Sequence, residues 1–402
     1  MNYNFDQIID RSNTNALKKD GWREYIFKDP EGKKVFNFSD EEFIHMWVAD
    51  MEFRTADEII DAIKCRADHG IIGYTTVYND DYPNAFASWC RRRYGFGFGR
   101  EELCYSAGII PALFELVGDI CGPDDKVVFQ TPSYGFFKHA STYNGREMLF
   151  NRMKYSGGRW EMNFDDLAEK CADPSAKLLV FCNPQNPTGR VWTEEELARV
   201  GQIAVDNDMY IISDEIHCDI QRSGVQHIPM ARVMKDYPKM ITCMSASKCF
   251  NIAGLQLANV IIRDPEIREK FRANDKLAGF LNPLSIAGMQ AAYEHGEDWL
   301  RQMTEYVDEN FRYVKSFLDE NFPEVEFEIP DATYLAWVNF GKVLPAGTDV
   351  NDFFANNAGV LIEGGDALFV DNAEGFVRLN LAMPRSLIEE AMDRIADAIR
   401  RA

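Results

Sequence analysis

The interpretation of this chain depends on the stretch Ser245-Ala246-Ser247-Lys248-Cys249-Phe250-Asn251. It follows the apolar run 240–244, which is typical of a strand that is buried on both faces. A lysine just past a strand can form a Schiff base with an aldehyde, and neighbouring serines can hold a phosphate. Pyridoxal 5'-phosphate (PLP) carries both of these groups. On its own the stretch is a weak signal, because most lysines are solvated surface charges.

Short apolar runs recur on both sides of this stretch, and helical stretches separate most of them. One such helix begins after Thr193, and Glu196 completes the pattern of a capping box. Nearly continuous apolar runs alternating with helices predict an α/β fold, with a mostly parallel central sheet covered by helices on both faces. The strands are expected at residues 126–130, 177–182, 209–213, 240–244 and 258–262.

After Pro283 the pattern changes to long amphipathic helices followed by isolated strands. Helices are expected at 285–295, 298–322 and 387–399, and strands at 325–329, 333–340, 360–363 and 375–381. We therefore predict a smaller α+β domain at 291–402 beside a large α/β domain at 49–290. The irregular segment 1–48 is expected to pack with the smaller domain.

Composition excludes several classes of function for these 402 residues. The formal net charge of −21 opposes binding to nucleic-acid phosphates or to anionic lipid. The nine cysteines show no Cys-x-x-Cys pair, which favours reduced thiols in the cytoplasm. The first residues lack the features of a signal peptide, and no apolar run is long enough to span a membrane.

Polar clusters follow three of the predicted strands. Asn186 lies in the turn sequence 183–189, Asp214 opens the sequence Asp-Glu-Ile-His, and Lys248 lies in the stretch quoted above. Open α/β sheets bind ligands at the carboxyl ends of their strands, so we expect these clusters to converge. In a PLP site Asp214 would keep the pyridine nitrogen protonated, which makes the ring a better electron sink. Asn186 would donate a hydrogen bond to the phenolate oxygen.

Each of these residues also has a purely structural interpretation. Asp214 could be a helix N-cap, and Asn186 could serve only to form a turn. His217 could reach the same oxygen as Asn186, or could be an ordinary buried histidine. It has no partner at metal-ligand spacing, so we expect no metal site.

Three further features fit a PLP site. Tyr134 follows a predicted strand, where its ring could stack on pyridine. Gly108 lies in a turn that leads into a predicted helix over 111–120. The N-terminus of that helix is either a phosphate-binding site or an ordinary turn. Arg378 interrupts an apolar strand, where its planar fork suits a carboxylate, with a structural ion pair as the alternative.

Taken in order, these motifs resemble the fold-type I PLP enzymes of the class I/II aminotransferase superfamily. Met46-Trp47-Val48-Ala49-Asp50-Met51-Glu52-Phe53, Gly73-Tyr74-Thr75 and Met383-Pro384-Arg385-Ser386 resemble one branch, the cystathionine β-lyase-like C–S lyases (MalY/PatB group). The resemblance runs from about residue 40 to the C-terminus. It departs at Gln256, where many relatives have a phosphate-binding arginine, and at Cys249.

The resemblance implies a role for each candidate residue. Lys248 would be the Schiff-base lysine, Asp214 the pyridinium partner and Arg378 the clamp for the substrate carboxylate. Tyr74 would come from a second subunit, so the protein would be a homodimer with its site at the interface. The remaining cofactor contacts would be Asn186 and His217 at the phenolate oxygen, Tyr134 on the ring, and Ile109, Ile110, Ser245 and Ser247 at the phosphate.

The expected reaction is an α,β-elimination on an L-amino acid with sulfur on Cβ. L-Cystathionine, L-cystine or an S-alkyl cysteine would yield a thiol, pyruvate and ammonia. An aminotransferase, which shares every cofactor contact, is the first alternative. A PLP-binding regulatory protein that acts through a protein partner is the second.

Overall fold

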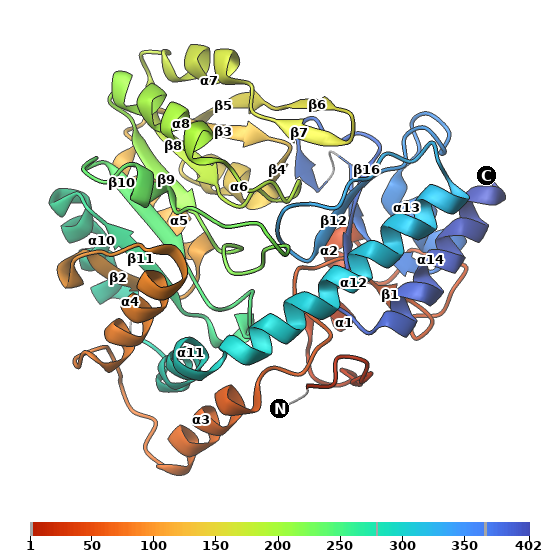
Figure 1. The fold of residues 1–402 in the computed structure, drawn as a ribbon, viewed down its shortest axis with the longest axis horizontal. Coiled ribbons are helices and arrows are strands. Elements are labelled where there is room, and N and C mark those ends of the chain that lie inside the picture. The colour runs from red at the N-terminus through yellow and green to blue at the C-terminus, as the bar shows by residue number, and fades with distance from the viewer. Residues whose placement is uncertain (1–2, 279, 366–367) are drawn as a thin grey trace.

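The computed structural model of this chain describes residues 3–278, 280–365 and 368–402. Its central feature is a seven-stranded sheet with the order β2-β11-β10-β9-β8-β3-β5 (Figure 1). All neighbouring strands are parallel except β11, which runs antiparallel to both β10 and β2. The mostly parallel sheet of the α/β prediction is confirmed. The strands are β2 (Leu103–Ser106), β11 (Ala258–Ile262), β10 (Met240–Met244), β9 (Tyr210–Asp214), β8 (Ala176–Cys182), β3 (Lys126–Thr131) and β5 (Glu147–Arg152).

Strand β5 was not among the predicted strands. It lies at the edge of the sheet, with Glu147 and Arg152 exposed and most of its other side chains only half-buried. The inner strands β9, β10 and β11 are almost entirely buried, which is why their apolar runs are continuous. An edge strand lacks that pattern, so apolar runs alone do not reveal it.

Helices cover both faces of the sheet, because alternate side chains of each strand point to opposite sides. In β8, Leu178 and Val180 share one core cluster with residues of α5, α6 and α10, whereas Leu179 and Phe181 share another with residues of α4, α7 and α8. Helix α8 starts with the predicted capping box of Thr193 and Glu196. These helices are α4 (Asp81–Tyr94), α5 (Ile109–Ile120), α6 (Gly135–Tyr143), α7 (Phe164–Cys171), α8 (Glu194–Asp206) and α10 (Pro265–Ala278).

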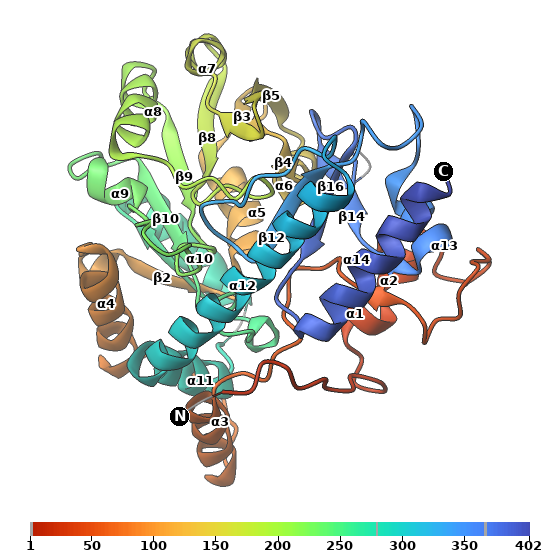
Figure 2. The same cartoon turned by 45° about the vertical axis from the view of Figure 1, so that its right-hand side comes forward.

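A second, three-stranded antiparallel sheet of order β12-β16-β14 lies beside the long helix α12 (Figure 2). The strand expected at 325–329 is wrong, since that segment makes only one isolated bridge, from Glu326 to Asn339. The strand expected at 360–363 is split, because β13 leaves to pair with β1 while β14 joins β16. The elements are β12 (Leu335–Asn339), β13 (Val360–Leu361), β14 (Glu363–Gly364), β16 (Phe376–Asn380), α11 (Pro283–His295), α12 (Glu297–Asn321), α13 (Val350–Ala358) and α14 (Arg385–Arg400).

The N-terminal segment packs against this second sheet region. Strand β1 (Ile44–His45) pairs in parallel with β13, and Trp22 and Trp47 pack in one cluster with Ala355 and Leu361. The assignment of 1–48 to the smaller domain and the three-part division at residues 48 and 290 stay predictions. The other short elements are α1 (Leu17–Asp20), α2 (Trp22–Phe27), α3 (Asp57–Asp68), α9 (Met230–Val233), β4 (Ser133–Tyr134), β6 (Lys154–Ser156), β7 (Arg159–Glu161), β15 (Phe369–Val370), η1 (Arg100–Glu102) and η2 (Ala253–Leu255). Of the helices within the described ranges, none has the length and apolar character to cross a bilayer.

Candidate active site

A cavity of about 290 Å³ lies where the parallel strands β8, β9 and β10 end. Its wall includes residues from each of the three polar clusters, so the tertiary fold brings together segments that are distant in the chain. Tyr74 does not line it; that side chain is 91% exposed, and its ring lies 4.9 Å from the ring of Phe280. The candidate residues that line the cavity are Ile109, Ile110, Tyr134, Asn186, Asp214, His217, Ser245, Ser247, Lys248 and Arg378.

Lys248 lies in the wall of this cavity, in the turn after β10. Its Nζ donates a hydrogen bond to the Ala49 carbonyl, at 2.7 Å. Burial lowers the pKa of Lys248 to about 8, and the nearby Asp50 carboxylate opposes that shift. A neutral amine is therefore accessible near neutral pH, which suits both attack on an aldehyde and abstraction of a proton.

Asp214 and His217 line the same cavity from the end of β9. Asp214 Oδ1 accepts a hydrogen bond from the Ile216 amide at 3.1 Å, in a turn that does not continue as a helix. Burial raises the pKa of Asp214 to about 7, and Lys248 lowers it. A cationic group in the cavity would therefore stabilise the ionised carboxylate.

Burial has the opposite effect on His217, whose pKa falls to about 3, so its imidazole is neutral. His217 Nδ1 is buried and has no hydrogen-bond partner among the described residues. A buried polar atom without a partner is costly, which suggests that a ligand or water satisfies it.

One end of the cavity can hold an anion. Helix α5 begins at Ile109, after Gly108, so the first amides of the helix lie at the cavity. Ser245 Oγ accepts a hydrogen bond from the Ser247 amide at 3.1 Å and donates one to the Leu257 carbonyl at 2.7 Å. Helix amides and the Ser247 hydroxyl are donors suited to a phosphate, whereas the Ser245 hydroxyl would have to turn its proton away from Leu257. Gln256 also lines the cavity, where it offers a neutral amide in place of a guanidinium.

Arg378 on β16 is 1% exposed and is surrounded by specific partners. It lies opposite Glu363 in the β14–β16 register, and its NH2 pairs with the Glu363 carboxylate. Its NH1 donates to Asn186 Oδ1 at 3.1 Å, whereas its Nε is buried without a partner among the described residues. The structural ion pair left open by the sequence is present, and it lies at the cavity where a carboxylate could also bind.

Several residues at the site were not predicted from the sequence. Glu363 is a buried charge in a predicted strand, and the argument applied to Arg378 would have identified it. Tyr334 donates to the Ala49 carbonyl at 2.8 Å, and Ala49 itself lines the cavity. Contacts through a backbone carbonyl have no signal in the sequence.

The chain matches the family Aminotransferase class I and II over residues 41–395. It belongs to this family. Among its curated relatives, cystathionine beta-lyase PatB of Bacillus subtilis is 34% identical to this chain, over 98% of this chain and 100% of the relative. Protein MalY of Escherichia coli is 29% identical, over 99% of each chain.

Solved structures of the family agree with this placement. A PLP-bound C–S lyase from Staphylococcus hominis, complexed with the inhibitor L-cycloserine, superposes with a TM-score of 0.95 at 47% identity, covering 99% of this chain and 98% of that one. Cystalysin from Treponema denticola, which contains PLP, superposes with a TM-score of 0.91 at 30% identity over 100% of both chains. The recognition of the superfamily and of its PLP-enzyme fold is confirmed.

Proposed function

We propose that this protein is a PLP-dependent carbon–sulfur β-lyase that converts L-cystathionine or a related S-substituted L-cysteine to a thiol, pyruvate and ammonia. One observation carries the proposal: Lys248, Asp214 and Arg378 line a single cavity in a chain that matches a PLP-bound C–S lyase over nearly its whole length. The related cystathionine beta-lyase of Bacillus subtilis supports the same class of substrate.

The residues of the cavity fit PLP by their chemistry. The cofactor, once bound, supplies an electron sink for the bond that breaks at Cα. Lys248 would hold its aldehyde, and Asp214 would pair with its ring nitrogen. The buried Nδ1 of His217, which has no partner among the described side chains, and the amide of Asn186 would face the ring oxygen. The start of α5, together with Ser245 and Ser247, would hold the phosphate, and Tyr134 would cover the ring.

Lys248 would also move the proton that the elimination requires. Its neutral amine would take the proton from Cα, and the Cα electron pair would form a double bond to Cβ as the Cβ–S bond breaks and its electron pair leaves on sulfur. Water would then hydrolyse the released enamine to pyruvate and ammonia. Arg378 would orient the substrate by its carboxylate. Since burial lowers the pKa of Lys248 to about 8, the fraction of neutral amine, and with it the rate, should rise with pH through that region.

The decisive test is product analysis with L-cystathionine on the PLP-loaded protein. We expect pyruvate and thiol in equal amounts, and a loss of about 10³-fold or more in kcat for Lys248→Ala. Borohydride reduction should attach the cofactor at Lys248 in the wild type. Stoichiometric amino-group transfer to the cofactor without thiol release would instead identify an aminotransferase.

A homodimer is part of this proposal. Exposed apolar side chains gather along the segment 71–78 and at Phe280, which contacts it. An apolar patch of this kind is typical of a protein–protein interface. A second copy would cover it and bring Tyr74 toward the partner's cavity. We place the protein in the cytoplasm, in line with its reduced cysteines.

A further inference from the structure

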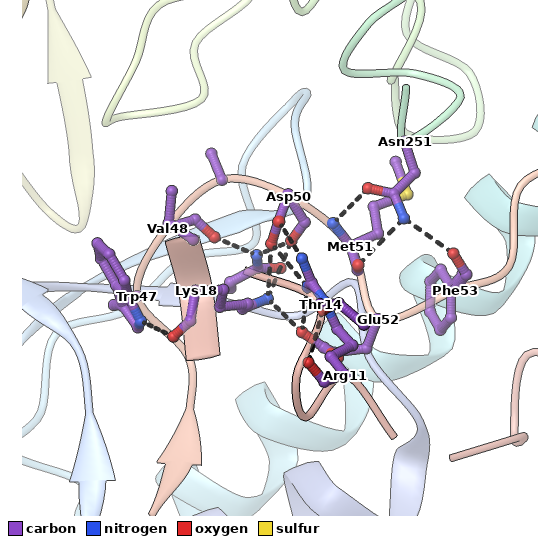
Figure 3. A network of polar contacts seen from close by, with 12 residues as sticks. Arg11, Thr14, Lys18, Trp47, Val48, Asp50, Met51, Glu52, Phe53 and Asn251 are labelled. Atoms are coloured by element: carbon purple, nitrogen blue, oxygen red, sulfur yellow. Dashed lines mark hydrogen bonds and ion pairs between the residues drawn. The ribbon is translucent and has the colours of Figure 1, made fainter. Parts of the chain in front are cut away.

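The loop 47–53 crosses the cavity edge and is held by side chains from distant parts of the chain. Asn380 on β16 donates to the carbonyls of Val48, at 2.8 Å, and Asp50, at 2.6 Å. Asn251, three residues after Lys248, accepts from the Met51 amide at 2.9 Å (Figure 3). The loop is therefore fixed on both sides of Ala49, the residue whose carbonyl reaches the cavity.

That carbonyl accepts two hydrogen bonds. Lys248 Nζ donates to Ala49 O at 2.7 Å, and Tyr334 OH donates to the same oxygen at 2.8 Å. The direction of the Lys248 amine thus depends on where the loop holds this oxygen. A displacement of the loop would displace the amine as well.

Lys18 supports the loop from the N-terminal segment (Figure 3). It is 1% exposed, and its Nζ donates to the Asp50 carbonyl at 3.0 Å. The same atom pairs with the carboxylates of Asp50, at 3.4 Å, and Glu52, at 3.0 Å. The indole of Trp47 donates back to the Lys18 carbonyl at 2.9 Å. Lys18 is therefore a buried cation whose charge is compensated by several partners in one loop, and not a solvated surface lysine.

The cluster is balanced in charge. Arg11 NH2 pairs with Asp50 Oδ2 at 2.8 Å, and Arg11 NH1 pairs with Glu52 Oε1 at 3.0 Å. Burial by itself raises the pKa of Asp50, but its ion pairs with Lys18 and Arg11 hold it below its ordinary value. Two cations therefore face two carboxylates directly behind the carbonyl that Lys248 contacts.

Other charged groups act on Lys248 from the elements packed around it. Asp50 is the strongest carboxylate neighbour, and the positive charge of Arg378 opposes it. Glu363 and Asp214 contribute smaller attractions, and His217 also lies close but is neutral. Asp50 is thus the anion that links the two sites: it pairs with Lys18 of the N-terminal segment and attracts the positive charge of Lys248.

We propose that Lys18 and Asp50 are a pair of positioning residues. They hold the Ala49 carbonyl against the Lys248 amine and determine the net charge of the loop next to that amine. This inference rests on the proposed role of Lys248. Its distinctive consequence is that the two partners of one ion pair affect Lys248 with opposite sign.

The signs follow from the charges. Asp50→Asn removes an anion, so protonated nitrogen at Lys248 loses an attraction and its apparent pKa falls. Lys18→Met leaves the loop carboxylates with only Arg11, so the local charge becomes more negative and the apparent pKa rises. A purely structural role for the pair would move both variants in the same direction.

The experiment titrates the absorbance of the bound cofactor in the PLP-loaded protein and the acid limb of the kcat profile. We expect a downward shift of about half a pH unit or more for Asp50→Asn and an upward shift of similar size for Lys18→Met. Arg301→Met, which removes a cation from an exposed pair with Asp298, is the matched control and should shift neither curve.

Shifts of the same sign, or unshifted curves in folded variants, would overturn the proposal. If Lys18→Met does not fold, Arg11→Gln replaces it and should give a smaller upward shift, because Arg11 is only partly buried. The absorbance titration does not depend on lyase activity. A wild type that binds cofactor but releases no thiol would refute the proposed function while leaving this test intact.

Discussion

At the scale of single residues, the pair formed by Arg378 and Glu363 is the most consequential feature of the cavity. Both side chains are buried, and their charges cancel. Burial raises the pKa of Glu363, while the neighbouring Arg378 lowers it. A substrate carboxylate would have to share the guanidinium with Glu363. The buried Nε of Arg378, for which the described residues provide no partner, is one of the guanidinium donors available to it.

Glu363→Gln should therefore tighten substrate binding and lower the free energy of unfolding of the protein. The change leaves Arg378 as an uncompensated buried charge, which costs on the order of 3–5 kcal/mol of stability. A substrate carboxylate restores the missing charge, so KM should fall about tenfold, or about 1.4 kcal/mol. Initial rates and thermal unfolding with and without substrate measure both effects. A higher KM with unchanged kcat would mean that Glu363 serves to orient Arg378.

At the scale of elements, the cavity is built where helices begin and strands end. The N-terminus of α5 and the turn after β10 both contribute residues to the wall of the cavity. The turn after β10 carries Lys248, but the α5 amides and the Ser245 and Ser247 hydroxyls are uncharged, and Gln256, which also lines the cavity, is a neutral amide. Binding of a phosphate would thus depend on amides and hydroxyls more than on ion pairs.

Ser247→Ala should reduce the affinity for the cofactor, with a smaller effect on the free energy of unfolding of the protein. Loss of one hydrogen bond to a charged group costs on the order of 1.5–3 kcal/mol, so the Kd for PLP should rise about tenfold or more. Equilibrium dialysis measures the Kd, and Ser316→Ala on the exposed face of α12 is the matched control. An unchanged Kd would place the phosphate away from this turn.

At the scale of the whole molecule, the exposed segment 71–78 is unusual for an isolated chain. Tyr74 and Tyr78 are 91% and 89% exposed, and Ile71 is 68% exposed. Large apolar side chains that lie together on a surface mark contacts with another molecule. The proposed dimer explains why Tyr74 lies outside the cavity of its own chain.

Mixing two inactive variants tests the shared site. In a dimer that exchanges subunits, Lys248→Ala and Tyr74→Ala chains combine so that one site of each mixed dimer has both residues intact. At equal amounts, about a quarter of wild-type activity should return by random pairing. Lyase activity after mixing and refolding measures the gain, with each variant refolded alone as the control. Activity no higher than the sum of the separate variants would show that Tyr74 acts only within its own chain.

The sequence by itself determined the local parts of this protein. Apolar runs revealed the inner strands because those strands are buried on both faces, and polar residues at their ends marked the cavity. Asp214 is the last residue of β9 and Lys248 lies four residues after the end of β10, so their placement needed no knowledge of distant contacts.

Only the tertiary structure decided the contacts between distant segments. The pairing of β13 with β1, which splits the expected strand at 360–363, depends on residues more than 300 positions apart. The same holds for Asn380, which donates to the Asp50 carbonyl from 330 positions away. Lys18 donates to the same carbonyl from the N-terminal segment, 32 positions away. These partners meet only after folding. Their acceptors are backbone carbonyls, which every residue carries, so neither the residue type nor the spacing in the sequence indicates the contact.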